Sequence, residues 1–154
     1  MAQIAKLEVQ VDIKTSAQRF YETFRSKQNL FPRICPDLIK DIKVIKGDWE
    51  SVGSIKQWTY VAGDSETSKE SVESIDDANK TIIFRVVEGD ATNYYKNLRL
   101  KVQVTGKGGG CSVKYTLEYQ KVNDNIPAPT RYLDIVTVLS KKSKLISTIT
   151  KYCT

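Results

Sequence analysis

Residues 127–139 read PAPTRYLDIVTVL, and this stretch decides the fold. Pro127 and Pro129 suit the entrance of a helix, where a missing backbone N–H costs nothing. Beyond them, apolar residues recur at spacings of three, four and seven: Tyr132, Ile135, Val136, Leu139, Ile146, Ile149 and Cys153. This period predicts one amphipathic helix of about twenty residues, roughly 30 Å long. A single apolar stripe of that length needs a partner face to bury it.

The chain before this helix reads as strands separated by turns. Alternation of polar and apolar residues predicts strands over residues 6–13, 40–46, 54–61, 66–75, 81–87, 97–105 and 112–120. The run GKGGG at residues 106–110 is the clearest hairpin signal. Because short turns join consecutive strands, the sheet should be an antiparallel meander.

Two short helical pieces are expected after the first strand. Thr15 or Ser16 can cap a helix that places Phe20 and Phe24 on its inner side, and prolines at 32 and 36 interrupt any longer helix. The chain has no repeats and no linker that would divide it, so residues 1–154 should form one α+β domain. We expect a curved sheet wrapped around the C-terminal helix, with a ligand cavity between them.

Composition narrows the class of protein. Apolar residues make up 40% and charged residues 27% of the chain, which is ordinary for a globular protein. Residues 1–11 read as the first strand rather than a signal peptide, and no window approaches the length of a membrane span. We therefore expect a cytoplasmic protein without integral membrane association. The net charge of +6 permits contact with anions, but no basic groove interleaved with aromatics indicates a nucleic-acid partner.

The chain contains no histidine, and this removes whole classes of chemistry. Ser-His-Asp and Cys-His nucleophile systems are excluded, as are zinc sites of the usual Cys/His kind. Cys35, Cys111 and Cys153 are odd in number and widely spaced, which favours small buried thiols over a disulfide framework. Any general acid or base must be a carboxylate, lysine or tyrosine with a shifted pKa. No cofactor and no metal are expected.

The loop between the second and third predicted strands is rich in glycine and could be taken for a phosphate cradle. Such a cradle needs GxxxxGK[ST] between a strand and a helix. Here Gly53 is followed by Ser54 and Ile55, and the chain continues as a strand. A conformational role for Gly47 and Gly53 is therefore the preferred interpretation.

Four blocks of sequence carry a resemblance to a known family. They are NLFP at 29–32 followed by Ile34 and Pro36, KGDWESVGS at 46–54, FRVVEGD at 84–90 followed by Tyr95 and Lys96, and YTLEYQK at 115–121 followed by Pro127 and Pro129. In this order they resemble the plant superfamily of birch pollen allergen and major latex proteins, the pathogenesis-related class ten type. The glycine-rich loop, with an aromatic in place of a glycine, is most similar to the major latex branch.

The resemblance implies a START-like helix-grip fold: a seven-stranded antiparallel sheet, two short helices and a C-terminal helix around an apolar cavity. It also implies carriage of a hydrophobic metabolite, hormone or lysolipid, linked to defence or stress responses. The alternative is a pocket enzyme of plant specialised metabolism that uses Lys, Glu and Tyr for acid–base chemistry. The preferred interpretation is a carrier, acting as a monomer or weak dimer with a small hydrophobic ligand as its partner. Major latex relatives usually carry several histidines, so any histidine-dependent behaviour does not transfer.

A register like that of the family, together with alternation along each strand, selects the residues expected to line the cavity. Val72, Val86, Val102 and Val113 should also face inward. The expected ligand-binding set is Phe24, Lys56, Trp58, Tyr60, Glu70, Ile82, Phe84, Leu98, Leu100, Tyr115, Leu117, Tyr119, Tyr132, Ile135, Val136 and Leu139.

Within this set, the polar residues are the most informative, because burial of a polar group is unfavourable unless it is paired. Lys56 and Glu70 could face the cavity, satisfy each other and orient a polar ligand group. They could equally lie at the rim as a solvated pair. The hydroxyls of Tyr60, Tyr115 and Tyr119 would add further polar contacts.

Overall fold

The computed structural model describes residues 3–146 of the chain. In chain order its elements are β1 (Ala5–Ile13), α1 (Ala17–Ser26), the 3₁₀ helix η1 (Gln28–Leu30), α2 (Phe31–Ile34), β2 (Ile39–Lys46), β3 (Ile55–Ala62), β4 (Asp64–Asp76), β5 (Thr81–Gly89), the 3₁₀ helix η2 (Asp90–Asn93), β6 (Tyr95–Lys107), β7 (Gly110–Lys121) and α3 (Thr130–Lys141). All the predicted strands are present, and their order along the chain is as expected.

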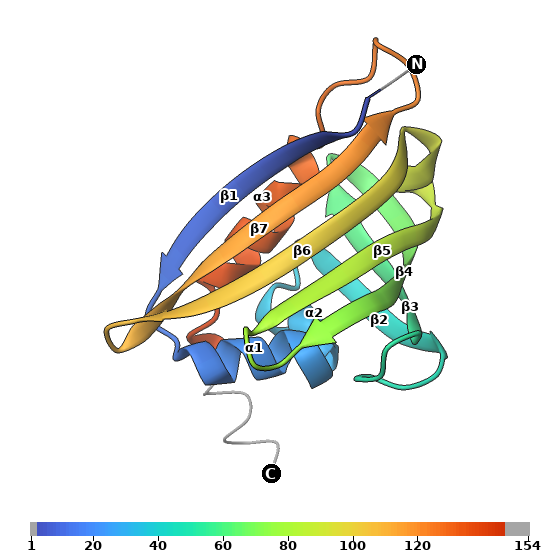
Figure 1. Cartoon of the computed structure of the whole chain (residues 1–154). Coiled ribbons are helices and arrows are strands. Elements are labelled where there is room, and N and C mark those ends of the chain that lie inside the picture. Colours follow the sequence, from blue (N-terminus) through green and yellow to red (C-terminus); the bar gives the residue numbers. More distant parts are fainter. Residues whose placement is uncertain (1–2, 147–154) are drawn as a thin grey trace.

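One antiparallel sheet of seven strands, in the order β1-β7-β6-β5-β4-β3-β2, forms the body of the molecule. It curves around α3, while α1 and α2 cover one end (Figure 1). Alternation fixes the register: Val9 lies opposite Tyr115 and Val11 opposite Val113 on the inner face of β1 and β7. The predicted α+β helix-grip architecture is confirmed.

The first helix is capped by Ser16, whose side chain accepts a hydrogen bond from the backbone N–H of Arg19 at 3.3 Å. Phe20 and Phe24 are buried on its inner side, with ring centroids 5.5 Å apart. The chain then passes through η1 into α2, which has a proline in its first turn. Two short helices therefore follow β1, as the prolines indicated.

The C-terminal helix departs from the expected single helix of about twenty residues. α3 begins at Thr130, directly after Pro129, and ends at Lys141. The N–H of Lys142 bonds to carbonyls three and four residues back, both at 3.2 Å, and a turn follows. The apolar period continues through this turn to the buried Ile146, so periodicity alone could not reveal the break. The positions at 149 and 153 lie outside the described residues.

The glycine-rich loop between β2 and β3 has the conformational role that was expected. Gly47 and Gly53 have φ angles of 82° and 88°, a region that favours glycine. The Asp48 carboxylate accepts the backbone N–H groups of Glu50 at 2.9 Å and Ser51 at 2.7 Å. The loop then enters strand β3 and not a helix, so the phosphate-cradle interpretation is excluded.

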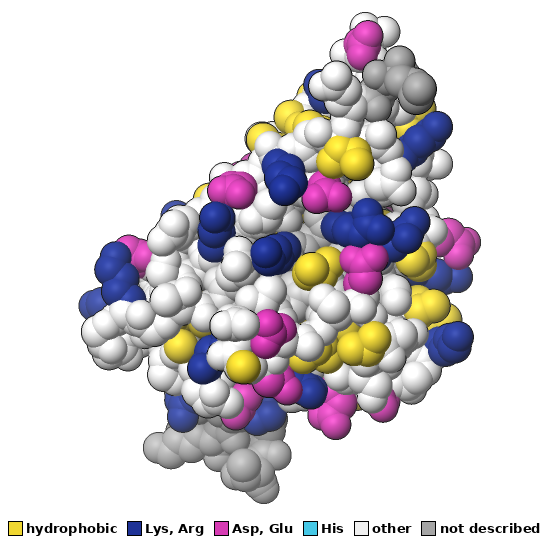
Figure 2. All heavy atoms as spheres, viewed as in Figure 1, with side chains coloured by type: hydrophobic (Ala, Val, Ile, Leu, Met, Phe, Trp, Pro, Cys, Tyr) yellow, Lys and Arg dark blue, Asp and Glu magenta, His cyan; other side chains and the backbone are white. Residues whose placement is uncertain are grey.

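The outer face of the sheet is charged but mixed in sign. Arg99 pairs with Glu73 at 2.9 Å and Lys114 with Glu8 at 3.4 Å. Figure 2 shows basic and acidic side chains interspersed over this face. Such exposed pairs contribute little to stability. None of the described helices is long and apolar enough to cross a bilayer.

The cysteines that the structure describes fit the expectation of small buried thiols. Cys35 and Cys111 are both free and buried, and burial raises the pKa of the Cys111 thiol to about 11. A thiol in that state is a poor nucleophile. Cys153 lies outside the described residues.

Candidate functional site

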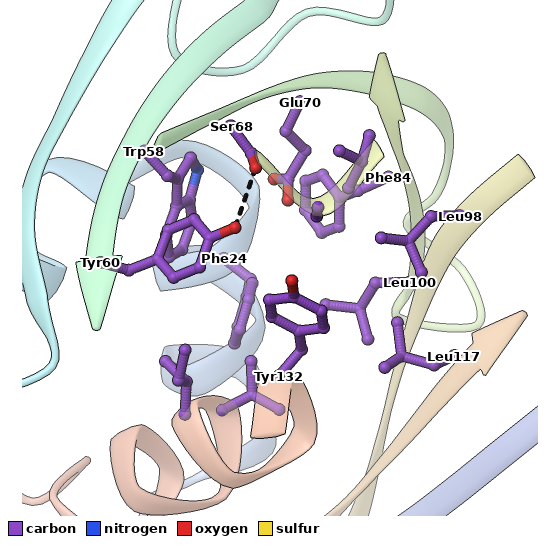
Figure 3. A pocket seen from close by; sticks show the side chains of 14 residues that line it. Phe24, Trp58, Tyr60, Ser68, Glu70, Phe84, Leu98, Leu100, Leu117 and Tyr132 are labelled. Atoms are coloured by element: carbon purple, nitrogen blue, oxygen red, sulfur yellow. Dashed lines mark hydrogen bonds between the residues drawn. The ribbon is translucent and has the colours of Figure 1, made fainter. Parts of the chain in front are cut away.

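A cavity of about 90 Å³ lies between the sheet and α3. Its wall is contributed by α1, β3, β4, β5, η2, β6, β7 and α3, so strands and helices distant in the sequence meet there (Figure 3). The lining residues are Phe24, Trp58, Tyr60, Ser68, Glu70, Phe84, Val86, Ala91, Leu98, Leu100, Leu117, Tyr132, Ile135 and Val136. The wall is mainly apolar and aromatic, with a few polar atoms, which is the usual character of a small-molecule site.

Most of the expected ligand-binding residues lie in this wall. They are Phe24, Trp58, Tyr60, Glu70, Phe84, Leu98, Leu100, Leu117, Tyr132, Ile135 and Val136. Side-chain alternation brings β3 and β4 residues to the same face, because Trp58 is paired directly with Ser68 and Tyr60 with Glu66. That these residues bind a ligand stays a prediction.

The other expected residues lie outside the cavity wall: Lys56, Ile82, Tyr115, Tyr119 and Leu139. All are buried, so alternation placed them on the correct face. Their side chains pack against neighbouring residues and do not border the cavity. The Tyr115 hydroxyl hydrogen-bonds Ser140 of α3 at 2.5 Å, and the Tyr119 ring packs on Tyr95 with centroids 5.7 Å apart. The part of α3 near Ser140 and Leu139 therefore sits directly on the sheet.

Lys56 is buried but does not reach the cavity. Its side chain is only 2% exposed, and its Nζ lies 5.9 Å from the centre of the Trp49 ring in the glycine-rich loop. It forms no hydrogen bond or ion pair with any residue that the structure describes. Burial lowers the pKa of Lys56, and the nearby charges of Glu70 and Asp48 oppose this effect. Neither arrangement considered for the pair holds for Lys56, which lies inside the protein, away from both the rim and the cavity wall, and forms no ion pair with Glu70.

Glu70 carries the one carboxyl among the described residues that line the cavity. It makes no hydrogen bond within the described residues, and part of its surface remains accessible, consistent with a side chain facing the cavity. Burial raises the pKa of Glu70 from 4.5 to about 7, and the charge of Lys56 opposes part of the rise. The cavity thus holds a group that exchanges a proton near neutral pH.

A polar cluster closes the other end of this wall. Glu66 accepts hydrogen bonds from the hydroxyls of Tyr60 at 3.1 Å and Tyr132 at 2.9 Å. Arg131 forms an ion pair with Glu66 at 3.4 Å and lies over the Tyr132 ring, 4.9 Å from its centre. Through Tyr132 and Arg131, Glu66 of β4 therefore ties the first turn of α3 to the sheet, and through Tyr60 it is bonded to β3. Sequence reasoning did not single out Glu66 or Arg131.

Two lining residues were missed, and they differ in how they could have been found. Ser68 lies between Glu66 and Glu70 on alternating positions, so the period of β4 would have placed it inward. Ala91 belongs to η2, where no alternation applies, and no sequence signal indicates it. Val86, expected on the inner face, does line the cavity.

Gly89 packs closely against Ser68, a residue of the cavity wall. Its φ is 128°, and a Cβ there would collide with the backbone of Thr67 and Ser68 and lie 2.9 Å from Ser68 Oγ. Only glycine permits the end of β5 to approach β4 so closely. This residue belongs to the FRVVEGD block noted in the sequence.

The arrangement can enclose an apolar group and hold one polar group against β3 and β4. Among the described residues no cluster of three or more His, Cys, Asp or Glu side chains is arranged to hold a metal ion. Burial shifts the pKa toward neutral in two groups at or near the cavity, Glu70 on its wall and Lys56 opposite it on β3.

Comparison with known proteins agrees with this architecture. Residues 2–146 match the pathogenesis-related protein Bet v 1 family. MLP-like protein 34 of Arabidopsis thaliana is 37% identical over 139 residues, covering 88% of this chain but only 44% of that protein's length. The crystal structure of ginseng major latex-like protein 151 from Panax ginseng superimposes with a TM-score of 0.85 at 31% identity, covering 90% of this chain and 94% of that one.

A more distant likeness concerns the fold alone. Norcoclaurine synthase from Thalictrum flavum, solved in complex with dopamine and hydroxybenzaldehyde, has a TM-score of 0.75 at 18% identity, covering 96% of this chain and 88% of that one. Three findings agree. The seven-stranded sheet curves around α3, the family match covers nearly the whole described chain, and the ginseng protein has a similar structure. By sequence and by structure, this chain belongs to the pathogenesis-related protein Bet v 1 family.

Proposed function

We propose that this protein binds and carries a small hydrophobic plant metabolite in the cavity between its sheet and α3. The observation that carries the proposal is the cavity wall, in which aromatic and aliphatic side chains surround a small number of polar atoms. Burial of ligand surface would supply most of the binding energy, at about 25 cal/mol for each Å² of apolar area.

The size of the cavity restricts the ligand or requires the wall to move. Its volume of about 90 Å³ is well below the roughly 300–1,000 Å³ of sites for drug-sized ligands. A cavity that binds benzene measures about 150 Å³, so even a single ring requires side chains of the wall to move apart. A hormone or lysolipid requires α3 to move away from β3 and β4, and the Glu66 cluster is the contact that must open.

Native mass spectrometry of protein purified from its own tissue tests the proposal. A single co-purifying apolar metabolite of defined mass is the expected result. Its chemical identity after release should match the compound before binding, because a carrier leaves its ligand unchanged. Loss of the metabolite in a variant with a filled cavity, such as Ala91→Phe, would place it there. Retention of the metabolite in that variant would contradict the assignment.

An enzymatic alternative is supported by the position of Glu70, a carboxyl on an aromatic cavity wall whose pKa is raised by burial. A carboxyl that titrates near 7 inside an aromatic cavity has the property required of a general acid or base. An enzyme would convert its bound compound to a product, and Glu70→Gln would abolish the conversion while leaving binding largely intact. Recovery of unchanged compound after prolonged incubation would favour the carrier.

We further propose that this binding takes place in the cytoplasm and serves defence or stress responses in a plant. Family membership is the support for this proposal. A fluorescent fusion in plant cells should remain in the cytoplasm, and transcript levels should rise after wounding or infection. Secretion of the fusion, or transcript levels that do not change after wounding or infection, would contradict this proposal.

A further inference from the structure

Most polar groups of the cavity wall lie on β3 and β4, and the Tyr132 hydroxyl of α3 is already bonded to Glu66. Trp58 and Ser68 are directly paired across these strands, and Glu70 is the next inward residue of β4. Figure 3 shows their side chains together at one side of the cavity, with apolar side chains opposite. Any ligand that fills the cavity must meet this wall.

Trp58 presents a hydrogen-bond donor without an acceptor. Its indole Nε1 is buried and has no partner within the part of the chain that the structure describes. Trp58 itself lines the cavity. Buried donors in native proteins are nearly always paired, and leaving one unpaired costs about 1–3 kcal/mol. The indole N–H therefore requires an acceptor, and it can take no other role, because indole nitrogen only donates.

Ser68 presents an acceptor, and neighbouring groups fix this polarity. Glu66 is paired with Arg131, and an ionised carboxylate can only accept. The single proton of the Tyr60 hydroxyl is therefore donated to Glu66 at 3.1 Å. The contact of 2.8 Å between Tyr60 and Ser68 must then use the Ser68 proton. The Ser68 oxygen therefore keeps a lone pair with which to accept, and Ser68 lines the cavity.

The wall thus offers one donor, Trp58 Nε1, and one acceptor, Ser68 Oγ, on paired residues. Glu70 beside them accepts when ionised and donates when protonated. A ligand carboxylate cannot donate to Ser68, and a ligand ammonium cannot accept from Trp58. A neutral hydroxyl can accept from Trp58 and donate its one proton to Ser68 or, when Glu70 is ionised, to Glu70. We propose that the ligand is an apolar ring compound with one hydroxyl group, a phenol or cyclic alcohol, held between Trp58 and Ser68.

This inference rests on the proposed function and adds the chemical class of the ligand. It is tested with four small probes that share a para-methylphenyl body: p-cresol, p-xylene, p-toluate and p-methylbenzylamine. Each is titrated by calorimetry into the full-length protein near neutral pH. We expect p-cresol to bind about tenfold more tightly than p-xylene, the factor for one net buried hydrogen bond. The acid and the amine should bind more weakly than p-cresol.

Two conservative variants and two matched controls locate the effect. Trp58→Phe removes the donor and keeps a ring, and Ser68→Ala removes the acceptor. Each should reduce the preference for p-cresol over p-xylene about three- to tenfold. Ser71→Ala removes a hydroxyl from the opposite face of the same strand, and Trp49→Phe removes the other indole. Both controls should leave the preference unchanged.

The outcomes distinguish failure of the proposed carrier function from failure of the hydroxyl assignment. If no probe binds, the proposed carrier function fails and this inference fails with it. If the probes bind with similar affinity, or if the acid or amine binds best, the cavity function stands and the hydroxyl assignment is overturned. A preference for p-cresol that survives both Trp58→Phe and Ser68→Ala would also overturn it.

Discussion

Lys56 and Glu70 lie directly opposite each other on β3 and β4, yet they form no ion pair within 4.0 Å. Lys56 turns toward Trp49, while Glu70 stays on the cavity wall. Each side chain is therefore desolvated without a close partner. Their charges interact at longer range, which partly opposes the pKa shift that burial causes in each.

The first prediction concerns stability against pH in Glu70→Gln. The pKa of Glu70 is about 7 in the folded protein against an ordinary value of 4.5. Because the folded value is the higher one, the carboxyl contributes most to stability below pH 4.5, and this contribution is lost as the pH rises through 7. The loss amounts to about 3 kcal/mol, at about 1.4 kcal/mol for each pKa unit. Urea unfolding across this range should show a flatter profile in the variant.

The absence of histidine makes this measurement clean, since no imidazole titrates in the same range. Glu73→Gln is the matched control, because Glu73 lies on the same strand but on the outer face, paired with Arg99. Its profile should follow that of the unmodified protein. A profile for Glu70→Gln with an unchanged slope between pH 5 and 7 would show that Glu70 titrates near its ordinary value.

The second prediction is that Lys56→Met raises the pKa of Glu70 further. The ammonium favours the ionised carboxylate, so its removal leaves only the effect of burial. A carbon-13 NMR titration of the Glu70 carboxyl group measures this shift directly. Lys69→Met, on the outer face and paired with Glu88, should leave the titration unchanged. A fall in the Glu70 pKa after Lys56→Met would contradict the described arrangement.

The third prediction separates core from cavity wall along α3. Leu139 is 1% exposed and lies outside the cavity, whereas Val136 lines it. Leu139→Ala should lower the free energy of unfolding by about 2–5 kcal/mol with little effect on p-cresol affinity. Val136→Ala should lower stability less and change the affinity, because it enlarges the cavity. Equal effects on affinity in the two variants would mean that the wall is assigned incorrectly.

The fourth prediction concerns Gly89. In Gly89→Ala the new Cβ would collide with the backbone of Thr67 and Ser68, so β5 must shift. Gly53→Ala is the control, because Gly53 also has a positive φ of 88° but nothing within 4 Å of the added carbon. Both variants should lose about 1–3 kcal/mol from backbone strain. Gly89→Ala should lose more in thermal unfolding, and it should also weaken the p-cresol preference, because Ser68 moves. Equal losses would argue against the close approach.

Much of this fold could be predicted because each signal is local. Alternation identified the strands and their inner faces, and Ser16 was one of two candidate caps for α1. The end of α3 could not be predicted, because the apolar period runs on through the turn after Lys141. The hydrogen bond from Ser140 to the carbonyl of Val136, and its contact with Tyr115, depend on tertiary packing that periodicity does not describe.

The cavity wall, like the fold, could be predicted from the sequence only in part. Alternation decides which face a side chain takes, but it does not decide whether the space in front is empty. Tyr119 faces inward as expected, but its ring packs against Tyr95 and does not border the cavity. Lys56 faces inward as well, but its long side chain turns toward the loop at Trp49. Ala91 joins the cavity wall from η2, which has no alternating pattern that could predict it.

The two tryptophans of the chain allow one direct test of the central claim that a ligand occupies this cavity. A proton–nitrogen NMR spectrum resolves the indole N–H signals of Trp58, on the cavity wall, and Trp49, in the loop. On titration with p-cresol, the Trp58 signal should shift downfield and saturate, while the Trp49 signal stays in place. An unmoved Trp58 signal, or a shift confined to Trp49, would contradict the account.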